Sequence, residues 1–252
     1  MSYILSLSYG KDSIACLGAI EQLGWPLDRI VTADVWATDT IPADLPPMVE
    51  FKAKADEIIK KRWGIKVEHY RADMTFQDIF YRPSKKYGIY AFPTRKCNWC
   101  NGELKMPAIK KAINSFKNAT LYVGIAADEP NRFHNLTGTK KSPLVEAGWT
   151  EADCRRWCEE NNLLSPIYTT TARGGCWFCH NQSVGQLRFL RKNYHELWKL
   201  MLKWDLDSPV SFKPDGHTVH DFDMRFNAED KGLITPGDKS FRWEKLRGNL
   251  DD

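Results

Sequence analysis

The chain has 252 residues, 42% of them hydrophobic, and a formal net charge of +4 at pH 7. This length supports one sizeable core with a smaller appendage, and the mild basicity permits a nucleotide or nucleic-acid partner without requiring one. No stretch approaches the roughly 18 apolar residues that span a bilayer, and no basic segment precedes the first apolar run. We therefore expect a cytoplasmic protein without membrane contact.

Strand-like and helix-like segments alternate through the first two-thirds of the chain. The predicted strands, rich in β-branched and aromatic residues, are residues 3–8, 30–36, 65–70 and 121–125. The predicted helices are residues 13–23, 46–63, 103–116 and 151–162, and Thr150 with Asp153 forms a capping signal before the last of them. Strands separated by helices pair in parallel, so we predict an α/β fold with a doubly wound, mainly parallel sheet.

The pattern changes after about residue 180. Residues 183–204 are predicted to form one long helix, with Leu187, Leu190, Leu197 and Met201 at helical spacing. Prolines and glycines with little periodicity follow it. We therefore predict an α/β domain over residues 1–180 and a helical or irregular C-terminal extension over residues 181–252, packed on the core.

A short charged stretch, residues 8–13 (SYGKDS), separates the first predicted strand from the first predicted helix. Backbone N–H groups at a helix N-terminus point outward and carry partial positive charge, which favours a bound anion such as phosphate. Gly10 permits a tight turn, Ser8 and Ser13 add hydroxyls, and Lys11 adds a cation. Asp12 fits such a site if Mg²⁺ bridges it to the phosphates. The alternative is an ordinary strand–helix turn with a solvated lysine.

The same stretch resembles the PP-loop of the ATP pyrophosphatase (adenine nucleotide alpha hydrolase-like) superfamily. Further motifs resemble the phosphoadenylylsulfate (PAPS) reductase branch of that superfamily. In chain order they are Asp39-Thr40, Cys100 followed by Lys105 and Pro107, the run from Gly124 through Glu129 to Arg132, Ser142-Pro143-Leu144, and Trp149-Thr150 to Pro166-Ile167-Tyr168. The resemblance covers about residues 1–180, with matching order and spacing.

The resemblance implies a Rossmann-like domain that binds ATP and cleaves it between the α- and β-phosphates. Two departures separate the chain from the sulfonucleotide reductases. No cysteine follows Cys179, where those enzymes carry a nucleophilic cysteine in a C-terminal tail, and Ala126 stands where their pattern has an arginine. Both departures count against reduction of a sulfonucleotide.

The candidate nucleotide-binding residues are Ser8, Gly10, Lys11, Asp12, Ser13, Asp39, Lys105, Glu129 and Arg132, and the candidate catalytic residues are Lys11, Asp12 and Arg132. Several of these have a second interpretation. Asp39 suits Mg²⁺ or a ribose, or else a helix cap. Glu129 and Arg132 follow a predicted strand at its carboxyl end, where they can clamp a phosphate or form a surface ion pair. Lys105 can reach the nucleotide or remain solvated.

Two C-x-x-C pairs, Cys97 with Cys100 and Cys176 with Cys179, can close a four-sulfur shell if the fold brings them together. Four thiolates accept either Zn²⁺ or a [4Fe–4S] cluster. The resemblance to iron–sulfur adenylylsulfate reductases, which carry cysteines before the same Lys–Pro helix and a later C-x-x-C, favours [4Fe–4S]. The alternative is four cysteines that pack as small apolar residues.

Two further groups of residues are explained more simply by packing. Cys154 and Cys158 are spaced i, i+4, which suits a buried helix face better than a metal site with two ligands. The predicted helix at residues 183–204 carries cations and aromatic residues that can bind single-stranded nucleic acid, although a solvated basic face is the preferred interpretation. These residues are Arg188, Arg191, Lys192, Lys199 and Lys203 with Tyr194, Trp198 and Trp204.

Three functions are compatible with this sequence. The first is an enzyme that cleaves ATP to AMP and pyrophosphate and adenylates a substrate for sulfur transfer or nucleic-acid modification, with a nucleic acid or a sulfur-donor protein as partner. The second is an adenylylsulfate (APS) or PAPS reductase whose thiol comes from another protein. The third is a non-catalytic nucleotide sensor or nucleic-acid-binding module with a structural metal.

Overall fold

The computed structural model describes residues 2–94, 96–113, 118–169, 174–238 and 240–244. The chain divides into two compact units, one made of Met1–Phe76 and Cys100–Cys176 and the other of Gln77–Trp99 and Trp177–Asp252. A boundary after Cys176 lies close to the predicted one at residue 180. The second unit also takes Gln77–Trp99, an inserted segment that the sequence pattern does not reveal.

The first unit is built on five parallel strands in the order β3-β2-β1-β6-β7. Their bounds are β1 Ser2–Ser6, β2 Arg29–Asp34, β3 Val67–Arg71, β6 Ala119–Tyr122 and β7 Lys140–Lys141. The chain runs outward from β1 to β2 and β3 and then returns on the other side of β1 as β6 and β7. The predicted doubly wound α/β fold is confirmed. Open sheets of this kind bind ligands outside the carboxyl ends of their strands, where the strand order reverses.

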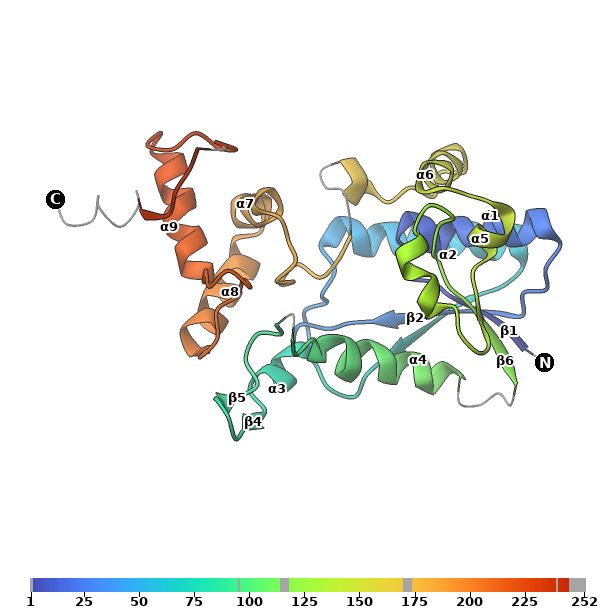
Figure 1. Cartoon of the computed structure of the whole chain (residues 1–252), viewed down its shortest axis with the longest axis horizontal. Coiled ribbons are helices and arrows are strands. Elements are labelled where there is room, and N and C mark those ends of the chain that lie inside the picture. The colour runs from blue at the N-terminus through green and yellow to red at the C-terminus, as the bar shows by residue number, and fades with distance from the viewer. Residues whose placement is uncertain (1, 95, 114–117, 170–173, 239, 245–252) are drawn as a thin grey trace. The chain divides into compact units, whose positions relative to one another are not determined.

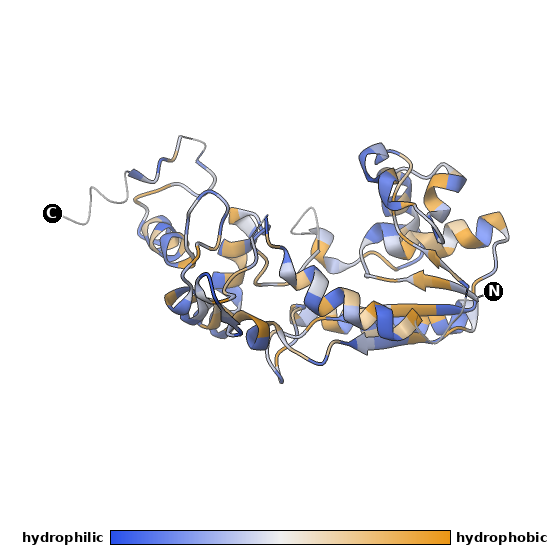
Figure 2. Cartoon of the chain, turned by 60° about the horizontal axis from the view of Figure 1, so that its bottom comes forward, coloured by the Kyte–Doolittle hydropathy of each residue, from blue (hydrophilic) through white to orange (hydrophobic). Residues whose placement is uncertain are grey.

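Helices cover both faces of this sheet (Figure 1). Those that share a core with Leu5 of β1 are α1 (Lys11–Leu23), α2 (Pro46–Trp63), α5 (Pro143–Ala147) and α6 (Glu151–Glu160). On the opposite face, Ala112 of α4 (Met106–Ile113) packs with Ile4 and Val31. Ile4 and Leu5 therefore point to opposite faces, as the two-residue period of a strand requires. Figure 2 shows the consequence for hydropathy: the central strands are mainly hydrophobic, whereas the helices alternate between hydrophobic and hydrophilic residues.

Short helical turns complete the first unit. They are a π-helical turn that leads into α4, η1 (Asn101–Lys105), and two 3-10 turns, η2 (Pro130–Asn135) and η3 (Pro166–Thr169). The capping signal at Thr150 is also present: the Thr150 side chain accepts from the Asp153 amide, and the Asp153 carboxylate accepts from the Thr150 amide. This reciprocal capping explains why α6 begins at Glu151.

The second unit contains α3 (Phe76–Phe80) from its second residue onward and a hairpin of β4 (Pro83–Ser84) and β5 (Gly88–Ile89). It also contains the helices α7 (Val184–Asn193), α8 (His195–Asp207) and α9 (Val219–Asp230). Aromatic rings form its core. Trp177 stacks on Trp204 with ring centroids 5.6 Å apart, and Phe80 lies 6.0 Å from the Trp204 ring. Because Phe80 belongs to the inserted segment, this segment and the C-terminal helices share one core.

The prediction of one long helix over residues 183–204 is wrong. The helix breaks at Tyr194, whose backbone angles are φ −134° and ψ 63°, and α8 starts at the next residue. The side chains on the two sides of the break, Leu187 and Leu190 on α7 and Trp198 and Met201 on α8, are all buried. Helical periodicity continues across the break, so only packing against other elements separates the two helices.

Helix α9 falls in the part of the chain expected to be irregular. Thr218 and Asp221 cap its first turn by the same reciprocal hydrogen bonds that begin α6. The T-x-x-D spacing was therefore a usable signal here as well. No helix in the described part of the chain is long and apolar enough to cross a membrane.

Candidate nucleotide site

Residues 8–13, here called the elbow, connect β1 to α1 and are held together by one hydroxyl. Ser13 Oγ accepts from the Ser8 amide at 3.1 Å and from Ser8 Oγ at 3.0 Å, and it donates to the Gly10 carbonyl at 3.0 Å. Ser13 is only 6% exposed. Its hydroxyl therefore stabilises the turn, and its predicted contact with a phosphate stays a prediction.

The tight turn depends on Tyr9 and not on Gly10. Tyr9 has φ 57°, in the left-handed region that non-glycine residues avoid. Holding a residue there costs about 1–3 kcal/mol, and such strain is concentrated at functional sites. Gly10 is ordinary extended backbone, with φ −74° and ψ 153°, and it caps α1 without a side-chain hydrogen bond. The first turn of α1 therefore lacks the side-chain cap that serine or aspartate would supply at this position. Its first amide, that of Lys11, donates to Tyr168 Oη at 3.0 Å.

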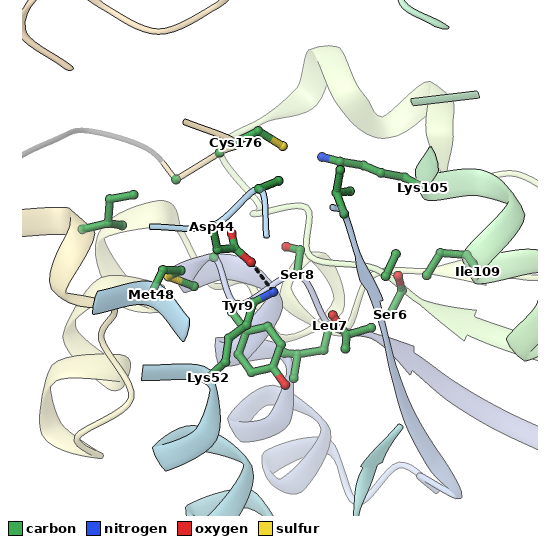
Figure 3. A pocket seen from close by; sticks show the side chains of 18 of the residues that line it. Ser6, Leu7, Ser8, Tyr9, Asp44, Met48, Lys52, Lys105, Ile109 and Cys176 are labelled. Carbon is green, nitrogen blue, oxygen red and sulfur yellow. Dashed lines mark ion pairs between the residues drawn. The ribbon is translucent and has the colours of Figure 1, made fainter. Parts of the chain in front are cut away.

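A pocket of about 450 Å³ opens on one side of the elbow, at the carboxyl ends of β1 and β2 (Figure 3). Its apolar lining includes Met48, Ile109 and Ile167. The lining residues with polar side chains are Ser6, Ser8, Tyr9, Thr32, Asp44, Lys52, Asn101, Lys105, Tyr168 and Cys176. The pocket thus combines an apolar wall with convergent polar groups, which is typical of small-molecule sites.

An ion pair forms part of the pocket wall. Lys52 Nζ lies 2.6 Å from Asp44 Oδ2 and 3.1 Å from Asp34 Oδ1, and the lysine side chain is 12% exposed (Figure 3). Burial lowers the pKa of Lys52, but the charges of the two carboxylates outweigh it and the pKa is raised. Lys52 is therefore a fixed cation at neutral pH, and its charge is balanced by the acids beside it.

The other side of the elbow carries carboxylates. Asp12, Glu129 and Glu151 each offer an oxygen within 4.8 Å of the others. Lys11 Nζ lies among them, 2.6 Å from Asp12 and 3.2 Å from Glu151. Burial, opposed by the Lys11 ammonium, raises the pKa of Asp12. The chain after β6 packs closely against the first turn of α1 at Gly124. A Cβ added to Gly124 would lie only 2.6 Å from the Ser13 nitrogen, so only glycine permits this approach.

The candidate nucleotide residues are therefore divided between two neighbourhoods. Ser8, Gly10 and Lys105 line the pocket, and Figure 3 shows Lys105 and Cys176 extending toward the same part of it. Lys11, Asp12 and Glu129 belong to the carboxylate side and do not line the pocket.

Two other candidates lie apart from the pocket lining. Arg132 Nη1 donates to both Glu129 oxygens, at 2.7 and 2.8 Å, and the Arg132 side chain is 49% exposed. This geometry is the surface ion pair that was the alternative interpretation. Asp39 is 88% exposed and lies 3.5 Å from the Arg71 guanidinium. Neither Arg132 nor Asp39 contributes to the pocket wall as the structure describes it.

The four C-x-x-C cysteines are distributed between the units. Cys100 and Cys176 belong to the first unit, and Cys97 and Cys179 belong to the second. Cys97 is exposed and the other three are partly exposed. Among the described residues, the one group of three or more potential metal ligands is the carboxylate set around Asp12, and no cysteine belongs to it. The four-cysteine centre stays a prediction; Arg95 and Arg173 beside these pairs lie outside the described residues.

The remaining cysteines are core residues. Cys16, Cys154 and Cys158 are fully buried where α1 packs against α6. Cys158 Sγ donates to the Lys11 carbonyl at 3.3 Å, and burial raises the pKa of Cys158 to about 12. This agrees with the preferred packing interpretation of Cys154 and Cys158.

The arginines of the basic face predicted at residues 183–204 form ion pairs with acidic residues of the same unit. Arg188 pairs with Glu229 of α9, and Arg191 pairs with Asp223 and Asp230. Trp198 and Trp204 are buried, at 4% and 0% exposure, so they cannot stack on bases in this conformation. These arginines therefore bind α7 to α9.

Sequence reasoning missed three contributors to the site. Asp44 and Lys52 carry no motif, and they reach the pocket only because the loop after β2 and the start of α2 fold over it. Tyr168 lies in the stretch used for the resemblance, but no role follows from its position in the sequence.

The chain matches no model of a known protein family and no curated protein. What is established is the architecture: an α/β fold with five parallel strands in the order 3-2-1-6-7, consistent with Rossmann-like and adenine nucleotide alpha hydrolase-like folds.

Proposed function

We propose that the chain is a PP-loop enzyme that binds ATP in the pocket beside the elbow and transfers its adenylyl group to a substrate, releasing pyrophosphate. The observation that carries this proposal is a pocket of about 450 Å³ bordered by a helix N-terminus whose capping residue, Gly10, has no side chain. The Lys11 amide donates to Tyr168, but Gly10 gives the first turn no side-chain cap, so this turn favours an anion, and the apolar wall favours a base.

The pocket residues suggest which part of the nucleotide each of them contacts. The adenosine contacts the apolar wall that contains Met48, Ile109 and Ile167. The phosphates lie toward Ser8 and the first turn of α1, and Lys105 reaches them from across the pocket. In this arrangement catalysis comes from positioning the α-phosphorus in line with the attacking and leaving oxygens and from neutralising their charge.

Mg²⁺ fits the carboxylate side of the elbow. Asp12, Glu129 and Glu151 are hard oxygen donors within 4.8 Å of one another, which is the donor chemistry this ion prefers. Bound there, Mg²⁺ would supply positive charge to phosphates that extend from the pocket past the elbow. Lys11 balances part of this carboxylate charge.

We also propose that Cys97, Cys100, Cys176 and Cys179 hold a metal centre, with [4Fe–4S] preferred to Zn²⁺. Four thiolates are the donor set that both centres require. Iron, sulfide and zinc analysis of anaerobically purified protein, with an absorption spectrum near ~400 nm, separates the two. Protein without bound iron or zinc contradicts the proposal.

The first experiment measures binding and then products. We expect α,β-methylene-ATP with Mg²⁺ to bind the unaltered chain, and Lys105→Met to weaken binding about tenfold, because it removes one charge-assisted contact worth ~1.4 kcal/mol. The matched control is Lys111→Met on α4, whose ammonium pairs with the exposed Asp73 and lies outside the pocket lining.

With ATP labelled in the α-phosphate we expect unlabelled pyrophosphate from the transfer and labelled AMP once the adenylyl group is displaced from the substrate, and Asp12→Asn should slow the release of both. ADP with inorganic phosphate contradicts the proposed cleavage position. Full retention of nucleotide binding and of the biological function in Asp12→Ala would favour the non-catalytic sensor.

Reduction of a sulfonucleotide is the second candidate function. It is favoured by one observation: the same pocket, with its apolar wall and the Lys105 ammonium, suits the adenosine and the anionic end of a sulfonucleotide, and the thiol would come from another protein. Sulfite release from adenylylsulfate or PAPS in the presence of thioredoxin tests it. The absence of sulfite under those conditions, with ATP cleavage present, leaves the first function alone.

A further inference from the structure

The elbow is strained at Tyr9, and the structure shows what holds it there. A non-glycine residue at φ 57° relaxes to an extended or right-handed conformation unless its surroundings prevent this. The backbone of Gly10 does not prevent it, because that residue has ordinary extended angles. The Ser13 hydroxyl ties Ser8 to Gly10 on either side of this residue, and the side chain of Tyr9 supplies a second restraint.

The phenol of Tyr9 is clamped below the pocket. Tyr9 is 1% exposed, and its Oη donates a hydrogen bond to Asp56 Oδ1 of α2. His69 Nε2 of β3 lies 3.3 Å from Tyr9 Oη, and Lys52 Nζ lies 5.1 Å from the centroid of the Tyr9 ring. Three groups from α2 and β3 thus surround one side chain of the elbow.

The clamp is itself held by charges. His69 Nε2 lies 2.9 Å from Asp56 Oδ2 and its Nδ1 lies 2.7 Å from Asp34 Oδ2 at the end of β2. Asp34 also binds Lys52. The carboxylate that accepts from Tyr9 is therefore fixed through a chain of ion pairs to β2 and β3 of the sheet.

We propose that Tyr9 is a positioning residue for the phosphates: its phenol, clamped by Asp56 and His69, keeps the elbow in the conformation in which Ser8 and Gly10 border the pocket. This inference rests on the proposed function. Tyr9 acts through the backbone on either side of it, so it affects the phosphate end of the ligand. The adenosine end contacts a different wall.

The test compares ATP with adenosine in the variant Tyr9→Phe. Removing the hydroxyl leaves the ring in place and releases the clamp. We expect the Kd for Mg²⁺–ATP, measured by isothermal titration calorimetry, to rise about tenfold while the Kd for adenosine stays the same. Asp56→Ala should give at least a similar rise, because it removes the partner of Tyr9 and also that of His69. Adding Tyr9→Phe to Asp56→Ala should have little further effect, because the hydrogen bond between them is already lost.

The matched control is Tyr81→Phe. Tyr81 Oη donates to Asp207 Oδ2 at 2.6 Å in the second unit, so this variant removes a similar tyrosine–carboxylate hydrogen bond away from the elbow. It should change neither affinity. Hydrogen exchange at the amides of Lys11 and Ser13 reports directly on the elbow, and we expect it to become faster in Tyr9→Phe alone.

Two outcomes overturn the inference while leaving the proposed function intact. One is an unchanged ATP affinity in folded Tyr9→Phe, and the other is an equal loss for ATP and adenosine, which is the result expected of a merely structural role. If the unaltered chain binds no ATP, the proposed function fails and the inference fails with it.

Discussion

His69 is an exposed histidine held between two carboxylates. Its Nδ1 lies 2.7 Å from Asp34 and its Nε2 lies 2.9 Å from Asp56. The hydrogen bonds to Asp34 and then Asp56, against a smaller opposing effect of burial, raise the pKa of His69 to about 9. At neutral pH the imidazole is therefore protonated, and it offsets part of the negative charge below the elbow.

This raised pKa makes the stability of the fold depend on pH. A group whose pKa is higher in the folded chain stabilises it fully below the unfolded value, about 6.5 for histidine, and less as the pH rises through the folded value. We expect His69→Gln to reduce the free energy of unfolding at pH 6, with a difference from the unaltered chain that shrinks between pH 6.5 and pH 9. Urea unfolding at several pH values measures it.

The control for this prediction is His134→Gln. His134 Nδ1 donates to the Asn131 carbonyl at 2.8 Å and faces no carboxylate in the described structure. This variant gives the effect of a His→Gln change made away from the Asp34–His69–Asp56 ion pairs, and the two variants are compared at each pH. A difference for His69→Gln that is the same at every pH would contradict the assigned ion pairs.

At the scale of elements, the position of α1 depends on its close approach to α6. A Cβ on Gly18 would lie 2.4 Å from the Trp157 ring, which is closer than real side chains come. The indole is itself confined, with Trp63 and Trp149 rings at 6.4 and 6.2 Å. Glycine at this position therefore lets α1 lie flat against α6 and fixes where its first turn points.

We predict that Gly18→Ala destabilises the chain by about 1–3 kcal/mol, the usual cost of overpacking a core, despite the better helix propensity of alanine. Thermal unfolding measures the loss. The matched variant is Gly185→Ala in α7, where the added Cβ meets only Ser183 Oγ, at 3.8 Å. At this position alanine gains its higher helix propensity without a steric clash, so the variant should be as stable as the unaltered chain or more stable. Equal effects at the two sites would refute the packing argument.

At the scale of the whole molecule, the second unit depends on a segment far away in sequence. Phe80 is fully buried and contacts Phe92, at 5.2 Å between ring centroids, and Trp204 of α8, at 6.0 Å. Phe92 in turn contacts Phe212, at 5.2 Å. The inserted segment therefore supplies part of the core on which the C-terminal helices pack.

We predict that Phe80→Ala destabilises the C-terminal helices by about 3–5 kcal/mol, the range for truncating a buried phenylalanine. Hydrogen exchange at the amides of α8 should become faster. Phe51→Ala is the control, because Phe51 belongs to the core of the first unit. It should accelerate exchange in α1 and α2 instead. Unchanged exchange in α8 after Phe80→Ala would mean that the unit does not need the inserted segment.

The alternation of strands and helices was readable from the sequence because it rests on local periodicity and on one topological rule. Residues 46–63 match the bounds of α2, and the elbow follows β1 as expected. A chain that alternates strand and helix has little choice but a parallel sheet with helices on both faces. The same reasoning placed a helix N-terminus at the carboxyl end of β1, which is the basis of the candidate site.

Only the tertiary structure decided which side of the elbow each polar group faces. Lys11 and Asp12 follow the pocket-lining residue Gly10 in the sequence, yet their side chains turn toward Glu151. Asp44 and Lys52, from the segment after β2, line the pocket instead. The strain at Tyr9 and the break at Tyr194 also leave no local signal. The physical reason is common to all of them: helical and strand periods depend on near neighbours, whereas side-chain direction and backbone strain depend on partners brought close by the whole fold.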